Sequence, residues 1–110
     1  MIKTASTDSG SGLAAVIPVA GGIDAAPIAV TGVAAVSTNV IGSEAFYIYS
    51  NTPLHFRTSL AGTLATVNDA PIPSGIPLVF ACTANHKISV IKMTGFADGN
   101  VWIHRLELAA

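Results

Sequence analysis

The sequence predicts an all-β protein: an antiparallel β-sandwich, jelly-roll-like, with an extended N-terminal arm. Short runs of β-branched and aromatic residues recur along the chain, and Gly, Pro, Asn or Asp residues separate them. No stretch of about ten residues carries the apolar period of an amphipathic helix. Strands at this spacing are typical of antiparallel sandwiches and small barrels. A chain of 110 residues is long enough for one domain with its own core.

The N-terminal residues differ from the rest of the chain. Residues 1–12, MIKTASTDSGSG, are polar, small and glycine-bearing. Because such a segment has little apolar surface to bury, we expect a flexible arm that becomes ordered only against a neighbour. Residues 13–110 form the single predicted sandwich domain.

Seven or eight short strands are expected in this domain. The clearest is AFYIYS at residues 45–50, where Phe46 and Ile48 face one way and Tyr47 and Tyr49 the other. The expected strands are 13–20, 28–36, 45–50, 54–58, 63–67, 78–83, 86–93 and 101–108.

Three of the other strands carry more specific expectations. Apolar or small residues occupy both sets of alternating positions in 28–36, as in a strand that is covered on both faces. In 54–58, Leu54 and Phe56 point inward, whereas His55 and Arg57 point outward. The pair Gly21 and Gly22 is expected to close the first strand.

The stretch TVNDAPIPSGIPLVF, residues 66–80, reads as a stiff corner. Asn68 and Asp69 offer side-chain acceptors to the local backbone, as in an Asx turn. Pro71 and Pro73 lack backbone donors, so no central strand can run through them. Ser74 and Gly75 permit the reversal, after which Leu78 and Phe80 are expected to enter the core.

The residues that usually carry chemistry are scattered. His55, His86 and His104 lie in or beside different strands, with no spacing typical of metal ligands. Cys82 shares the alternating face of Leu78 and Phe80, which indicates a small buried hydrophobe, and a single cysteine excludes an internal disulfide. The sequence contains no nucleophile elbow, P-loop or dinucleotide fingerprint. We therefore predict a protein that is not an enzyme and that has no catalytic residue, metal site or cofactor.

Charge and composition bear on the partners. Charged residues make up 10% of the chain and hydrophobic residues 51%, whereas an ordinary domain has roughly 25% charged residues. Part of the surface is therefore expected to be buried against copies of the chain, another protein or a membrane. A net charge of −1 without a basic run excludes binding through nucleic-acid phosphates.

A membrane span and a targeting signal are not expected. The charge-free run 25–43 contains Pro27 and two glycines, lacks Leu, Phe and Trp, and has no flanking Lys or Arg. The polar residues after Lys3 do not resemble the apolar core of a signal peptide.

Several residues are candidates for an interface. Arg57 and Asp69 are lone charges among apolar residues, and they either pair, across a sheet edge or between subunits, or remain two separate solvated charges. His104 and Arg105 beside Trp102 form a small polar patch that is expected at an interface. The complete set of candidates is Arg57, Asp69, Pro71, Pro73, Trp102 and His104.

Residues 44–108 resemble a diffuse group of small virion proteins of tailed bacteriophages. The matching elements are YSN at 49–51, LHFR at 54–57, AT at 65–66, DAPIPSG at 69–75, Phe80, ISVI at 88–91 and VWI at 101–103. The turn of the form D-x-P-x-P-x-G is the most specific of these elements.

The resemblance implies a non-enzymatic structural protein on the exterior of the phage capsid. It implies a decoration (cement) protein that forms a trimer and stabilises the capsid by bridging major capsid proteins. Two alternatives stay open: another minor virion component, such as a head–tail joining or tail-fibre protein, or a carbohydrate-binding virion module. In the second, Trp102, Tyr47 and Tyr49 would offer ring faces to sugars.

Overall fold

The structure is a computed structural model that describes residues 5–6, 13–14 and 19–106. Within these residues the regular structure consists of β-strands and no helix is present. The strands are β1 (Ala5–Ser6), β2 (Leu13–Ala14), β3 (Val19–Gly22), β4 (Ile28–Val30), β5 (Ala35–Val36), β6 (Ala45–Ser50), β7 (Leu54–Ser59), β8 (Ala70–Ile72), β9 (Leu78–Ala81), β10 (Lys87–Lys92) and β11 (Gly99–Leu106).

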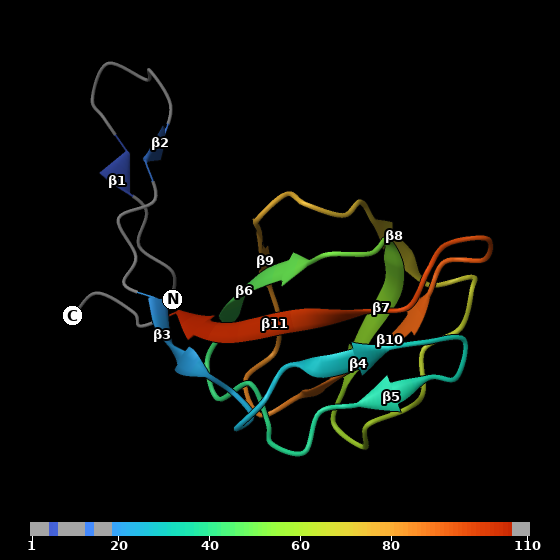
Figure 1. Cartoon of the computed structure of the whole chain (residues 1–110). Helices are drawn as coiled ribbons and strands as arrows, with labels where there is room; N and C mark the ends of the chain where they lie inside the picture. The colour runs from blue at the N-terminus through green and yellow to red at the C-terminus, as the bar shows by residue number, and fades with distance from the viewer. Residues whose placement is uncertain (1–4, 7–12, 15–18, 107–110) are drawn as a thin grey trace.

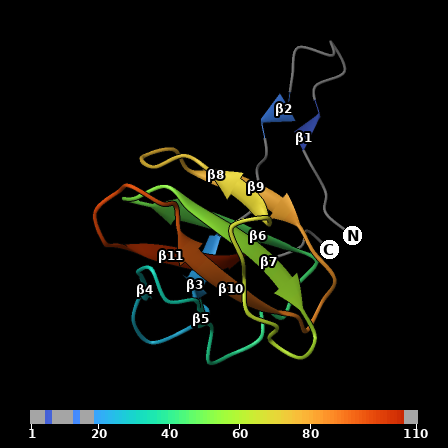
Figure 2. The ribbon, with the colours of Figure 1, turned by 90° about the vertical axis from the view of Figure 1, so that its right-hand side faces the viewer.

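Two antiparallel sheets make up the body of the protein (Figure 1). One has the strand order β5-β10-β7-β8, and we call it the four-stranded sheet. The other, the five-stranded sheet, has the order β3-β11-β6-β9, with β4 also paired to β11. The edge strands β8 and β9 lie on the same side of the body, and β4 and β5 lie on the opposite side (Figure 2). The prediction of an all-β antiparallel fold is confirmed.

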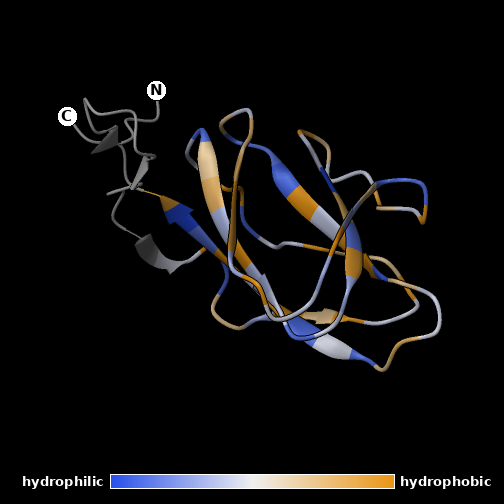
Figure 3. Ribbon diagram, turned by 90° about the horizontal axis from the view of Figure 1, so that it is seen from above, coloured by the Kyte–Doolittle hydropathy of each residue, from blue (hydrophilic) through white to orange (hydrophobic). Residues whose placement is uncertain are grey.

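The core lies between these two sheets. Phe46 and Ile48 from the five-stranded sheet and Leu54, Ile88 and Val90 from the four-stranded sheet are fully buried in one cluster. The ring of Phe46 lies 6.1 Å from that of Phe56 and 6.0 Å from that of Phe80. Hydrophobic and hydrophilic residues follow one another along individual strands, as a sheet with one buried face requires (Figure 3).

The orientations predicted for the central strands are correct. Phe46 and Ile48 are fully buried, whereas Tyr47 and Tyr49 are half-buried on the other face of β6. Leu54 is fully buried and Phe56 packs against the core, as expected for the inward residues of β7.

The prediction of one strand at 28–36 is wrong. The segment forms β4 and β5, which belong to different sheets. Between them the hydroxyl of Thr31 accepts a hydrogen bond from the amide of Val33 at 3.1 Å and donates one to the carbonyl of Val33 at 3.2 Å. This local bonding replaces a strand ladder with a turn. The apolar residues at both sets of alternating positions therefore belong to two short strands in different sheets and to the turn between them.

The prediction of a strand at 63–67 is also wrong. These residues form no strand, and the strand appears later, as β8, with Pro71 in its centre. The amide of Ala65 is bonded to the hydroxyl of Ser89 and not to a neighbouring backbone. The prediction that no central strand runs through Pro71 is correct, because β8 is the edge strand of its sheet.

The N-terminal predictions can be compared with the structure only in part. Gly21 and Gly22 belong to β3, where Gly22 pairs with His104, so they do not close a strand as expected. Within the predicted strand 13–20, residues 15–18 lie outside the described residues. Most of the predicted arm, residues 1–4 and 7–12, lies outside them as well. Ala5–Ser6 pairs with Leu13–Ala14 in a separate two-stranded sheet.

Candidate functional site

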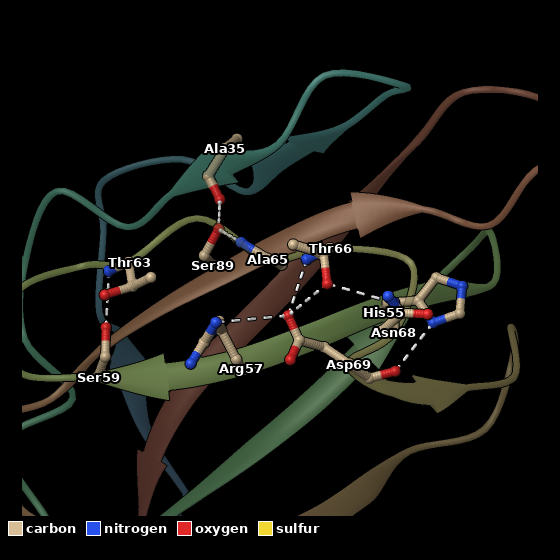
Figure 4. A network of polar contacts seen from close by, with 10 residues as sticks. All are labelled: Ala35, His55, Arg57, Ser59, Thr63, Ala65, Thr66, Asn68, Asp69 and Ser89. Carbon is tan, nitrogen blue, oxygen red and sulfur yellow. Dashed lines mark hydrogen bonds and ion pairs between the residues drawn. The ribbon is translucent and has the colours of Figure 1, made fainter.

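The outer face of the four-stranded sheet is covered by the chain segment that joins β7 to β8. The Asp69 carboxylate accepts a hydrogen bond from the amide of Thr66 at 2.8 Å and lies 3.9 Å from the guanidinium of Arg57 (Figure 4). A ring nitrogen of His55 lies 3.0 Å from the backbone oxygen of Asp69. Of the two readings of Arg57 and Asp69, the structure supports a pair, and the pair forms within one chain.

A buried serine anchors the same segment. The hydroxyl of Ser89, 1% exposed, donates a hydrogen bond to the carbonyl of Ala35 at 2.7 Å and accepts one from the amide of Ala65 at 2.8 Å (Figure 4). Near the surface, the hydroxyl of Ser59 accepts a bond from the amide of Thr63 at 2.7 Å. The segment is thus bonded to the sheet both in the interior, at Ser89, and near the surface, at Ser59.

An apolar groove of about 450 Å³ lies beside the proline-containing edge of the four-stranded sheet. Its lining residues are Pro53, Pro71, Ile72, Pro73, Ser74, Met93 and Phe96. The ring of Phe96 is 51% exposed. We call this surface the proline groove.

Hydrogen bonds hold both walls of the proline groove. The amide of Met93 donates to the carbonyl of Pro53 at 3.0 Å, and the hydroxyl of Thr52 donates to the carbonyl of Ala97 at 2.7 Å. On the other wall, Gly75 has a φ of 79°, which suits glycine, and its amide donates to the carbonyl of Ser50 at 2.7 Å. These bonds hold the backbone of both walls in place.

The outer face of the five-stranded sheet carries aromatic rings in pairs. The ring of Tyr47 lies 5.8 Å from that of His104, and the ring of Tyr49 lies 5.9 Å from that of Trp102. Each pair is formed by residues that face each other across β6 and β11. All of them are half-buried. We call this surface the aromatic face.

A cavity of about 270 Å³ opens on the aromatic face. Residues 22–28, which connect β3 to β4, form one wall, and residues 101–104 of β11 form the other. Trp102 and His104 line it, but Tyr47 and Tyr49 do not.

The predicted interface residues thus occupy different places. Arg57 and Asp69 lie on the outer face of the four-stranded sheet, Pro71 and Pro73 line the proline groove, and Trp102 and His104 belong to the aromatic face.

The chemically reactive residues do not gather in the described part of the chain. No group of three His, Cys, Asp or Glu side chains within residues 5–6, 13–14 and 19–106 is arranged to hold a metal ion. Burial, followed by the charge of Glu44, raises the pKa of the Cys82 thiol. Cys82 packs against the core as predicted, but it is half-buried and not fully buried, and its thiol donates a hydrogen bond to the carbonyl of Ser43 at 3.3 Å. No helix of the described residues has the length and hydropathy to cross a membrane.

Sequence reasoning missed Met93, Phe96 and Asp24. Met93 was expected to end the strand 86–93, but it follows β10, which ends at Lys92, and Phe96 lies in the connection to β11. Asp24 bonds to amides that are 14 and 15 residues away along the chain. An apolar ring in a turn is a signal that could have added Phe96 to the predicted prolines of this groove.

Comparisons with known proteins add no relative. No family model, curated protein or solved structure matches the chain.

Proposed function

We propose that this protein is a structural component of a tailed-phage virion that decorates the capsid exterior and stabilises it by bridging major capsid proteins. It acts as a trimer, without enzymatic activity, on a β-sandwich of jelly-roll type. The observation that carries the proposal is the proline groove: an apolar surface in a chain with only 10% charged residues.

The strand order supports the jelly roll. Counting β4 to β11 along the chain, the first, eighth, third and sixth strands form one sheet and the second, seventh, fourth and fifth form the other. This order fits an eight-stranded jelly roll, an architecture found among viral capsid and lectin domains. A fold by itself does not assign a function. The support for docking on a capsid protein therefore comes from the surfaces.

The proline groove supports docking on another protein. Exposed rings are enriched at the centres of protein interfaces, where they fill pockets on the partner. Phe96 is such a ring, and Pro71 and Pro73 beside it cannot donate hydrogen bonds, which limits strand addition along β8. The partner is thus expected to contact side chains of the groove and not to extend the sheet.

The resemblance of residues 44–108 to small virion proteins supports the same partner. Its most specific element, the DAPIPSG turn at 69–75, supplies Pro71, Ile72, Pro73 and Ser74 to the groove. The part of the chain that carries the resemblance therefore also carries the candidate docking surface.

Rebinding to depleted particles tests this proposal. Purified protein is added to virions that lack it, and bound protein and the temperature at which the capsids open are both measured. We expect wild-type protein to bind and to raise that temperature, and Phe96→Glu to abolish both effects. Leu60→Glu is the matched control, because Leu60 is 71% exposed at the far end of β7 and does not line the groove.

Three results would contradict the proposal or one of its parts. Depleted particles that open at the same temperature with and without the protein would exclude a stabilising role. Binding that Phe96→Glu leaves unchanged would exclude the proline groove as the docking surface. A solution mass other than three chains, from analytical ultracentrifugation, would contradict the trimer and favour the joining or tail-fibre position.

A further inference from the structure

The cavity on the aromatic face is a second surface, separate from the proline groove. It lies where the connection from β3 to β4 runs beside β11 (Figure 1). We propose that it binds one neutral pyranose ring of a glycan, with the ring packed on the indole of Trp102 and its hydroxyl groups bonded at the rim by Asp24. This site goes beyond the proposed capsid function and does not depend on it.

The wall opposite Trp102 is fixed by hydrogen bonds. The amide of Ile23 donates to the carbonyl of Ile103 at 2.9 Å, which ties the wall to β11. The two carboxylate oxygens of Asp24 accept the amides of Thr38 and Asn39, each at 2.9 Å. The side-chain amide of Asn39 returns a bond to the carbonyl of Ile23 at 2.9 Å. A preformed wall lowers the entropy that a ligand loses on binding.

Small residues keep the cavity open. Gly22, Ala25 and Ala26 line it, and Gly22 lies directly across from His104 in the sheet. A Cβ atom at Gly22 would lie 3.2 Å from the carbonyl oxygen of Asp24 and 3.9 Å from the ring of His104. Any larger residue at position 22 would therefore narrow the space beside the imidazole.

The aromatic wall suits a saturated ring. Trp102 is half-buried, and its packing against Tyr49, at 5.9 Å and 50°, restrains the indole. The volume of about 270 Å³ lies just below the roughly 300–1,000 Å³ of pockets for drug-sized ligands. This space is large enough for one six-membered ring.

The charges favour a neutral ligand with hydroxyl groups. No Lys or Arg lines the cavity, and the carboxylate of Asp24 would repel a phosphate or carboxylate. Asp24 lines the cavity, each of its carboxylate oxygens accepts one amide, and a carboxylate oxygen can accept a second donor. A proline or aromatic side chain of a partner protein would cover this carboxylate without bonding it, which is unfavourable, whereas a sugar hydroxyl would donate to it.

Titration of the full-length protein with simple sugars tests the site. Amide chemical shifts are followed while methyl glycosides of glucose, galactose, mannose, N-acetylglucosamine and N-acetylgalactosamine are added in turn up to about 50 mM, since single-ring sites bind in the millimolar range. We expect at least one sugar to give saturable shifts confined to residues 22–28 and 101–104.

Variants assign the contacts. Trp102→Ala is expected to weaken binding at least about tenfold, and Trp102→Phe to weaken it less because a ring face remains. Phe96→Glu removes an exposed ring outside the cavity and is expected to leave sugar binding unchanged. Unchanged amide dispersion in each variant shows that it is folded.

The outcomes that contradict the site are distinct from those that contradict the capsid function. No saturable shift with any of the sugars would overturn the proposal, as would binding that Trp102→Ala does not weaken. The same titration with N-acetylproline amide addresses the protein alternative: shifts at the cavity with this compound and none with sugars would replace the glycan by a partner side chain.

Discussion

The outer faces of the two sheets differ in whether another segment of the chain covers them. The four-stranded sheet is covered by the protein's own segment between β7 and β8, held by the buried hydroxyl of Ser89 and by the Asp69 carboxylate (Figure 4). The five-stranded sheet leaves Tyr47, Tyr49 and Trp102 half-exposed. Because both sheets contribute to one core, the difference between them lies on their outer faces.

The two outer faces differ in what their side chains contact. On the covered face, polar groups are bonded to each other within the chain, which stabilises the fold. On the aromatic face, half-buried aromatic side chains keep part of their apolar surface in contact with solvent, which leaves area for a ligand or partner. Stability should therefore depend more on the covered face, and sugar binding on the aromatic face. The proline groove lies at the edge of the four-stranded sheet, outside both faces.

The largest effect is expected at the core, which both faces share. Phe46→Ala removes a fully buried ring that contacts Phe56 and Phe80. We expect the free energy of unfolding to fall by about 3–5 kcal/mol, as for other buried aromatic truncations. Urea denaturation followed by tryptophan fluorescence measures it. A loss below about 1 kcal/mol would show that the two sheets do not share this core.

The next effect tests the covered face. Ser89→Ala leaves the amide of Ala65 and the carbonyl of Ala35 without their side-chain partner, and we expect a loss of about 2 kcal/mol. Hydrogen exchange of the Ala65 amide should accelerate. Ser59→Ala is the matched control, since its bond to Thr63 is exposed and should contribute about 0.5–1 kcal/mol. Equal losses for the two variants would contradict a buried anchor.

The aromatic face should tolerate a much larger truncation. Tyr47→Ala removes a whole ring that is half-buried and packed edge-on to His104 at 5.8 Å. We expect a loss of about 1 kcal/mol, less than removal of the single hydroxyl of Ser89. Thermal unfolding of the two variants under the same conditions makes the comparison. A larger loss for Tyr47→Ala would show that this face serves the fold and is not kept for binding.

The smallest effect concerns the ion pair of the covered face. A double-mutant cycle with Arg57→Ala and Asp69→Ala should give a coupling free energy below about 0.5 kcal/mol, because the charges are 3.9 Å apart and partly solvated. Asp69→Ala alone should be the more destabilising variant, since it also removes the acceptor of the Thr66 amide. Equal losses of stability in the two single variants, together with a coupling free energy well above about 0.5 kcal/mol, would instead show that the ion pair holds the segment to the sheet.

Local patterns predicted most of the strands but not the crossings between sheets. The alternation in AFYIYS placed Phe46 inward and Tyr47 outward correctly, because that strand is central and one of its faces is buried. The alternation in 28–36 gave no hint of the turn at Thr31, since a small hydroxyl residue fits a strand as well as a turn. At Ala65, the bond to Ser89 spans 24 residues, a distance over which sequence patterns carry no signal.

The candidate surfaces were predictable to a smaller extent. Pro71 and Pro73 stood out in the sequence because proline cannot donate to a strand ladder, and Trp102 because it is the single Trp of the chain; each lines a groove or cavity. The partners that complete these surfaces, Phe96 and Asp24, come from connections whose positions depend on the folded backbone. The turn residues around Phe96 are the one local signal for it, and no local feature of the sequence marks Asp24.

The amount of this protein in purified phage particles tests the capsid function most directly. Quantitative mass spectrometry of particles gives the ratio of its copies to those of the major capsid protein. A decoration protein is expected to be present in proportion to the major capsid protein, over the whole shell. A ratio that corresponds to a single ring per particle, or absence from the particle, would contradict the capsid function.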